Sequence, residues 1–279
     1  MKKKVFREIR FHIPVLLFGF VMIYPLLWML MSSFKEGTEL FHSASFWPSK
    51  WILDNYAYGW SGISGYSFGV FLKNSFLIVF VVMIGNVLSC SMTAYAFSKL
   101  RFPLRNFWFA IMMGTLMLPM HVKLIPQYII YNTLGWVNTY LPLTVSKFFA
   151  TEGFFIFMMT QYMRGLPHEL DEASRIDGCS FFQNYVRIIM PLSVPAIITT
   201  CIFSFIWTWN DFFSQMIYLS NVGTYTAALA LRQYVDAMGN SYWGALFAMS
   251  VVSLIPLMVM FIGLQRYLVD GITAGSIKG

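Results

Sequence analysis

The chain has 279 residues, of which 58% are hydrophobic, 19% aromatic and 11% charged. Its mean hydropathy of +0.63 is far above that of a soluble globular protein, which excludes the soluble classes. The net charge of +7 is not gathered on a basic soluble face, so a nucleic-acid-binding protein is also excluded.

Long apolar stretches dominate the chain. Four uncharged runs reach the roughly 20 residues that a helix needs to cross the hydrocarbon core of a membrane. Two further stretches are less regular, because one contains Pro119 and the other contains Lys147 and Glu152. Together they predict an all-α, polytopic membrane protein, with one transmembrane domain over residues 1–279. The six predicted spans are 13–34, 70–98, 106–128, 140–163, 191–214 and 244–266.

An even number of spans places both termini on the same side of the membrane. Basic residues identify that side as the cytoplasm, because 13 of the 19 Lys and Arg residues then fall in inside segments. The cytoplasmic segments include the loop 164–190 and the tail 267–279. The first apolar run is too long for a signal peptide and shows no small-residue cleavage site, so we expect an uncleaved first span.

The loop 164–190 holds a dense group of ionisable residues. Pro167 and the acidic residues after it favour the first turn of a helix, where a missing N–H costs little and the helix dipole attracts negative charge. Gly178 then ends the helix or lets another backbone approach closely. An apolar stretch, 181–189, leads to Pro191 and the fifth span. The sequence therefore predicts a short helix with an exposed acidic side, which lies across the cytoplasmic surface and contacts another protein.

This loop also carries a family resemblance. Glu172-Ala173-Ser174, then Gly178 after three residues, then Ile188-Ile189-Met190-Pro191 after nine more, resembles the cytoplasmic signature of permease subunits of ATP-binding-cassette (ABC) importers. The family pattern has Ala at Ser174 and Leu at Met190, and both differences are mild changes in volume. Further segments resemble carbohydrate-importer permeases, and the tail resembles the smaller permease of the maltose-type family. These segments are Asn74-Ser75, 94–98, Leu118-Pro119, Ile125-Pro126, 134–140, 209–212 and the tail 264–279.

The resemblance implies a type I ABC importer permease fold and a binding-protein-dependent importer of a sugar or oligosaccharide in a bacterial or archaeal cytoplasmic membrane. It implies four kinds of partner: a second, homologous permease that completes a heterodimer, two ATPase subunits, an extracytoplasmic sugar-binding protein and membrane lipid. The chain has no Gly-x-x-x-x-Gly-Lys-Ser/Thr loop, so we expect ATP and magnesium on the ATPase, no cofactor in this chain and no enzymatic activity of its own. The implied ATPase-coupling residues are Glu169, Glu172, Ala173, Ser174, Asp177 and Gly178, and the implied ATPase-contacting residues of the tail are Gly271, Gly275 and Lys278.

Polar residues at membrane depth indicate a solute pathway, because ionisable side chains are costly there and usually face an interior or a cavity. Two alternatives stay open: the charges pair with the partner permease, or the tryptophans form an interfacial aromatic belt. Three basic residues, Lys123, Lys147 and Arg232, would suit an acidic oligosaccharide. The candidate pathway residues are Lys147, Glu152, Trp207, Trp209, Asn210 and Asp211.

The polar segment 220–242 resembles the loop that reaches toward the binding protein in maltose-type relatives, although a solvated connector fits equally well. Its candidate contacts are Tyr225, Tyr234, Gly239 and Asn240. An importer of a sugar phosphate or polyol remains an alternative of the same architecture. A membrane-embedded enzyme would need clustered His, Asp or Glu at a membrane face, and a secondary transporter would show an internal repeat. The histidines and cysteines have no metal-ligand spacing: His12, His42, His121, His168, Cys90, Cys179 and Cys201.

Overall fold

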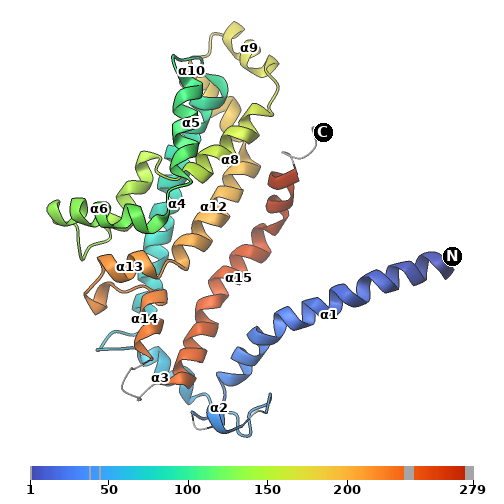
Figure 1. The fold of residues 1–279 in the computed structure, drawn as a ribbon, viewed down its shortest axis with the longest axis vertical. Coiled ribbons are helices and arrows are strands. Elements are labelled where there is room, and N and C mark those ends of the chain that lie inside the picture. The colour runs from blue at the N-terminus through green and yellow to red at the C-terminus, as the bar shows by residue number, and fades with distance from the viewer. Residues whose placement is uncertain (1, 38, 44, 236–241, 274–279) are drawn as a thin grey trace. The chain divides into compact units, whose positions relative to one another are not determined.

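The computed structural model describes residues 2–37, 39–43, 45–235 and 242–273, and these residues contain helices but no β-strand (Figure 1). They divide into two compact units, one made of residues 1–69 with 230–255 and the other of 70–229 with 256–279. The α-helices are α1 (Lys2–Ser32), α2 (Glu39–His42), α3 (Asp54–Ser61), α4 (Phe68–Lys99), α5 (Arg105–Thr115), α6 (Met120–Thr133), α7 (Leu141–Thr144), α8 (Gly153–Arg164), α9 (Glu169–Ile176), α10 (Phe181–Asn184), α11 (Met190–Leu192), α12 (Val194–Trp209), α13 (Phe213–Tyr218), α14 (Ala227–Gln233) and α15 (Trp243–Thr273). Short 3₁₀ turns are η1 (Val145–Phe149) and η3 (Val222–Thr224), and η2 (Tyr185–Ile189) is a π-helix.

Four helical segments of the described chain are long and apolar enough to cross a membrane. A fifth is present if 181–192 and Val194–Trp209, which meet at a bend of 76°, count as one broken span. The four segments are His12–Ser32, Phe68–Lys99, Leu141–Arg164 and Trp243–Tyr267. The all-α membrane architecture is therefore confirmed.

The third predicted span, 106–128, is not a single helix. Helix α5 ends at Thr115 and α6 begins at Met120, with Pro119 at the N-cap position of α6. Proline has no N–H for the helical ladder and disfavours helical backbone at the residue before it, so the chain breaks there. Figure 1 shows α6 turning across the direction of α5. The predicted span 191–214 is shorter as well, because α12 ends at Trp209.

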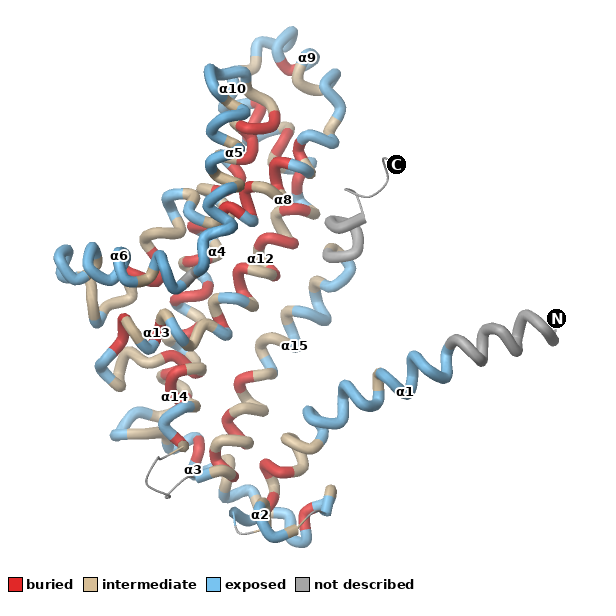
Figure 2. The backbone as a smooth tube through the Cα atoms, viewed as in Figure 1, coloured by how far each residue is buried: buried red, intermediate tan, exposed pale blue. Residues whose placement is uncertain are grey.

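In the first unit, α3 and α15 approach closely at a glycine. A Cβ at Gly244 would overlap the amide of Asn55, whose Nδ2 donates to the carbonyls of Ser33 and Lys35 at 2.9 and 2.8 Å. Helix α1 is apolar, and from residue 12 to 27 almost all of its side chains are exposed, whereas its last turn is partly or fully buried (Figure 2). Such an exposed apolar surface suits contact with lipid or another subunit.

In the second unit, α4 and α8 pack against the segment that runs from α10 into α12. Met159 and Met163 of α8 are fully buried, as are Ala94 of α4 and Ile189 of η2. Polar pairs also join the helices: the hydroxyl of Ser91 lies 2.7 Å from that of Tyr185. This core connects the loop 164–190 to the helices that cross the unit.

Candidate functional site

Helix α9, in the predicted cytoplasmic loop, has two different sides. At 3.6 residues per turn, Glu169, Glu172, Ala173 and Ile176 share one side, and all four are exposed. Ile176 is 86% exposed, although isoleucine is among the residue types most often buried. This side, called here the outer face of α9, is an apolar pair flanked by two carboxylates, which is a chemistry that a partner protein can bind.

The opposite side of α9 is attached to the rest of the second unit. Lys99 at the end of α4 has a side chain that is 1% exposed, and its Nζ lies 3.0 Å from Oδ2 of Asp171 and donates to the carbonyl of Leu166 at 3.0 Å. Nδ2 of Asn184 donates to Oδ1 of Asp171, also at 3.0 Å. Because both carboxylate oxygens of Asp171 are bound by buried partners, α9 is fixed to α4 and α10.

Ser174 belongs to this attached side, unlike the other implied coupling residues. It is 3% exposed, and its hydroxyl donates to the carbonyl of Asp171 at 2.9 Å. The hydroxyl is therefore satisfied within its own helix, which explains how serine can stand where the family pattern has alanine.

Gly178 ends α9, as the sequence predicted. Its φ is +76°, a left-handed conformation that glycine adopts without steric cost. The N–H of Gly178 donates to the carbonyl of Arg175, and that of Cys179 donates to the carbonyl of Ser174 at 2.9 Å. These two bonds form a Schellman motif. Ser180 then caps the next helical segment through a reciprocal pair of bonds with Gln183.

The tail residues are only partly placed. Gly271 lies within α15. Gly275 and Lys278 lie outside the described residues.

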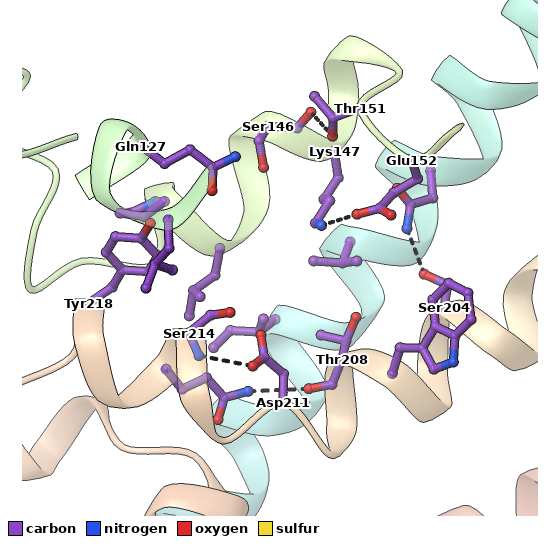
Figure 3. A pocket seen from close by; sticks show the side chains of 18 of the residues that line it. Gln127, Ser146, Lys147, Thr151, Glu152, Ser204, Thr208, Asp211, Ser214 and Tyr218 are labelled. Atoms are coloured by element: carbon purple, nitrogen blue, oxygen red, sulfur yellow. Dashed lines mark hydrogen bonds and ion pairs between the residues drawn. The ribbon is translucent and has the colours of Figure 1, made fainter. Parts of the chain in front are cut away.

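A cavity of about 580 Å³ lies within the second unit, between α4, α6, the α7–η1 segment, α8, α12 and α13 (Figure 3). Five of the six candidate pathway residues line it: Lys147, Glu152, Trp207, Asn210 and Asp211. Lys123 lines it as well. Residues that are far apart in the sequence are thus brought together around one polar space.

Three of the four charged groups in the cavity wall, those of Lys147, Glu152 and Asp211, already have partners of their own. Nζ of Lys147 and Oε1 of Glu152 form an ion pair (Figure 3). Oδ1 of Asp211 accepts the backbone N–H of Ser214 at 3.0 Å. Arg232, the third basic residue considered for an acidic substrate, belongs to the first unit and donates to the carbonyl of Val235.

Two polar groups that the sequence analysis missed also line this cavity. Nδ2 of Asn86 donates to Oγ of Ser204 at 2.8 Å, and both residues are almost fully buried. Tyr218 is 3% exposed, and burial, with smaller effects from Tyr131 and Asp211, raises the pKa of its hydroxyl to about 12. An asparagine in the middle of a long apolar run is the one sequence signal that would have pointed to Asn86.

Trp209 lies apart from the cavity. It is 5% exposed and stacks on Phe205, with ring centroids 5.4 Å apart and planes at 8°. Trp207, in contrast, is 45% exposed and stacks on Phe155 at 5.1 Å. Of the two tryptophans, only Trp207 lines the cavity.

The residues considered for binding-protein contact also separate. Tyr225 is partly exposed, and its carbonyl accepts Nδ2 of Asn74 at 2.9 Å. Tyr234 is 2% exposed, and its hydroxyl donates to the carbonyl of Gly59 at 2.6 Å. Its side chain is therefore buried in the first unit and hydrogen-bonded there. Gly239 and Asn240 lie outside the described residues.

Comparison with known proteins places this geometry in a family. The model of the binding-protein-dependent transport system inner membrane component matches residues 85–274, more than half of the chain. The trehalose/maltose transport system permease protein MalG of Thermococcus litoralis is 32% identical over 279 residues, and the match covers 100% of both chains. The arabinooligosaccharides transport system permease protein AraQ of Halalkalibacterium halodurans is 32% identical over 264 residues, covering 94% of this chain and 93% of that protein.

The fold has a counterpart among solved structures. A chain in the crystal structure of a bacterial ABC transporter involved in the import of the acidic polysaccharide alginate matches with a TM-score of 0.82 and 20% identity. The match covers 96% of this chain and 98% of that one, and at this identity it shows the fold alone. The chain therefore belongs to the family of binding-protein-dependent transport system inner membrane components, the permease subunits of ABC importers.

Proposed function

We propose that the chain is the transmembrane subunit of an ATP-driven, binding-protein-dependent importer of a sugar or oligosaccharide. Family membership supports the importer role, and the names of the two relatives, which refer to trehalose, maltose and arabinooligosaccharides, support the cargo. In this proposal a second, homologous permease completes the pathway, two ATPase subunits hold ATP and magnesium, and an extracytoplasmic binding protein delivers the sugar. The chain is a bacterial or archaeal membrane protein with both termini in the cytoplasm, needs no cofactor and catalyses no reaction itself.

The attachment of α9 is the observation that carries the coupling role. Its outer face is free for an ATPase, while Asp171 is bound to Lys99 of α4 and to Asn184. The carbonyl of Phe181 also accepts the hydroxyl of Tyr95 of α4 at 3.0 Å. A force applied to α9 is therefore passed to α4 and to the segment that leads into α12. Both helices line the cavity, so ATPase closure at α9 would change the shape of the cavity.

Hydrogen bonds at the two ends of the second unit support six membrane crossings. Lys99, Leu166 and Asp171 meet at one end, called here the α9 end. At the other, the Asn138 end, Oδ1 of Asn138 accepts the backbone N–H groups of Ser220 and Asn221 at 3.1 and 3.0 Å.

The broken third span must connect these two ends. The chain leaves the α9 end after Lys99 and reaches the Asn138 end at residue 138, so α5 and α6 cross together although neither is long enough alone. Helices α4, α7–α8 and α10–α12 make the other three crossings of this unit. With α1 and α15, the total proposed is six.

The test of the coupling role is ATP hydrolysis by the complex reconstituted with its second permease, its ATPase and a panel of binding proteins loaded with candidate sugars. Ile176→Asp places a charge on the apolar centre of the outer face, and we expect it to abolish sugar-stimulated hydrolysis in a complex that still assembles. Arg175→Gln, on the same helix but off that face, is the matched control and should keep the stimulation. Full stimulation in Ile176→Asp would refute the role of α9. If only binding proteins loaded with polyols or sugar phosphates stimulated hydrolysis, the proposal that the cargo is a sugar would be refuted.

A further inference from the structure

The cavity wall contains buried polar atoms whose hydrogen-bonding capacity is unused. Among the described residues, Oδ1 of Asn86 and the hydroxyl of Tyr218 have no hydrogen-bond partner. An unpaired buried polar group typically costs on the order of 1–3 kcal/mol. Two such groups beside one cavity indicate that the cavity is built for an occupant with polar hydrogens and lone pairs.

The amide of Asn86 can bind a hydroxyl whichever way it is turned. As placed, Nδ2 is bonded to Ser204 and Oδ1 is the unpaired atom. Turning the amide over would leave Nδ2 unpaired instead. A hydroxyl group donates and accepts, so it satisfies either atom. The terminal torsion of asparagine is soft, which lets the unpaired atom turn into the cavity.

The Tyr218 hydroxyl is the second free group. Its aromatic ring packs edge-on against Tyr131, with centroids 5.5 Å apart, and both tyrosines line the cavity. Figure 3 shows Tyr218 and Ser204, the partner of Asn86, on opposite sides of the cavity. A ligand that binds both groups must therefore be hydroxylated at more than one point.

The charges that line the cavity favour a neutral ligand. They are Lys123, Lys147, Glu152 and Asp211, two of each sign, and Lys147 is already paired with Glu152. A carboxylate on the ligand would meet as many carboxylates as ammonium groups, and the Lys147 ammonium is already paired with Glu152, so the wall offers an anion no net attraction. Of the three basic residues that suggested an acidic oligosaccharide, Lys123 and Lys147 line the cavity, where Glu152 and Asp211 balance their charge.

We propose that this cavity is a binding site for a short, uncharged saccharide, with Asn86 and Tyr218 as hydrogen-bonding residues and Trp207 as an aromatic wall. The volume of about 580 Å³ falls within the range of roughly 300–1,000 Å³ typical of small-molecule sites. This inference rests on the proposed function and extends it: cargo touches this subunit, and uronate sugars are disfavoured.

The test uses the complete complex, with binding of maltose, trehalose and arabinotriose measured by equilibrium dialysis and sugar uptake per ATP hydrolysed measured in proteoliposomes. Tyr218→Phe removes only the unpaired hydroxyl. We expect it to lower saccharide affinity and uptake per ATP about tenfold, which is the equivalent of one hydrogen bond. The sugar-free complex should melt at the same temperature or higher, because no native bond is lost. A hydroxyl with a merely structural role would instead lower the melting temperature.

A second variant, Asn86→Leu with Ser204→Ala, removes the other polar pair and should lower affinity by a similar factor. Ser91→Ala, on the same helix but bonded to Tyr185 outside the cavity, is the control and should leave saccharide affinity unchanged. Maltobionate, the acid analogue of maltose, should bind at least tenfold more weakly than maltose.

The outcomes separate the inference from the proposed function. Equal maltose and maltobionate affinity, unchanged affinity in both cavity variants, or no saccharide bound at all would overturn the inference, even if loaded binding proteins still stimulate ATP hydrolysis. If no loaded binding protein stimulates hydrolysis by the wild type, the proposed function falls and the inference falls with it.

Discussion

Gly178 follows the C-cap of α9, and its backbone conformation determines how the chain leaves the helix. Its φ of +76° closes the Schellman motif, and a Cβ there would meet no other atom within 4 Å. The requirement for glycine inside this chain is therefore conformational rather than a matter of space. The sequence predicted the helix end correctly from Gly178 alone, because few other residues adopt this conformation.

Substitutions at Gly178 should follow backbone preference rather than side-chain size. Gly178→Val is expected to destabilise the loop by about 1–2 kcal/mol, since β-branched residues are strained at positive φ. Gly178→Asn, which tolerates the left-handed region, should cost much less. The measurement is sugar-stimulated ATP hydrolysis of the assembled complex as a function of temperature. Equal loss in both variants would mean that contact with the ATPase, not φ, requires glycine.

Tyr234 provides a second test at this scale. Tyr234→Phe removes one of the two donors to the carbonyl of Gly59, which keeps the N–H of Gly62, so we expect about 0.5–1.5 kcal/mol of destabilisation. Affinity for the binding protein, measured by surface plasmon resonance on the reconstituted complex, should not change. A loss of that affinity without a change in melting temperature would instead identify Tyr234 as a binding-protein contact.

Residue types alone could not distinguish outward-facing from inward-facing side chains. The 172–191 motif identified α9, but not that Ser174 is attached while Ile176 is exposed, because the choice depends on where Lys99 and Asn184 lie in space. Trp209 was grouped with Trp207 for the same reason. Two aromatic residues separated by two positions point to different sides of a helix, and only packing decides which of them is buried.

At the scale of elements, the joint between α9 and α4 depends on one ion pair. The side chains of Lys99 and Asp171 are 1% and 13% exposed. Removing one partner of such a buried pair leaves an uncompensated charge, whereas replacing both by apolar groups is often tolerated.

Asp171→Asn is therefore expected to destabilise the α9 joint by about 3–5 kcal/mol, and the double variant Asp171→Leu, Lys99→Met by much less. A double-mutant cycle of the wild type, Asp171→Leu, Lys99→Met and the double variant, followed by the melting temperature of the complex, measures the coupling. The double variant should assemble into the complex but show weaker sugar-stimulated ATP hydrolysis, because Asn184 then has no carboxylate to bind and α9 is held less firmly. Additive effects of the two single changes would show that the ion pair does not hold α9.

Elements were predicted well where the helix continues through its prolines, as α1 does at Pro14 and Pro25 and α15 does at Pro256, and poorly where the helix breaks at Pro119. The spans at 70–98 and 244–266 lie within α4 and α15, and the span at 13–34 overruns the end of α1 at Ser32 by two residues; each of these helices has more than 30 residues. The run at 106–128 contains enough apolar residues for a span, but Pro119 separates it into α5 and α6. Hydropathy averages over a window of residues and contains no information on helix orientation, so it could not show that α6 runs across the direction of α5.

For the whole molecule, the cavity assembles from six elements that no sequence window contains. Asn86, Lys147 and Trp207 come from three of them and Asp211 from the turn between α12 and α13, and their proximity follows from the crossings of the second unit. The loop motif could be recognised from the sequence because all its residues lie within 20 positions of one another. The cavity could be predicted only in part, because its lining depends on contacts between segments that are distant in the sequence.

The crossing pattern yields a topology that labelling can test. The bonds of Asn138 place residues 133–139 and 219–221 at the same end of the second unit, and those of Lys99 place Cys179 near the other end. In a background without Cys90 and Cys201, a membrane-impermeant maleimide should label Thr133→Cys and Ser220→Cys in spheroplasts. Native Cys179 should react only in inverted vesicles stripped of the ATPase. If Thr133→Cys were labelled from the same side as Cys179, neither α5–α6 nor α7–α8 would cross the membrane, because Lys99 and Asp171 hold residues 99 and 171 at one end of the unit. The chain would then cross the membrane four times, with α1, α4, α10–α12 and α15, and the proposed six crossings would be refuted.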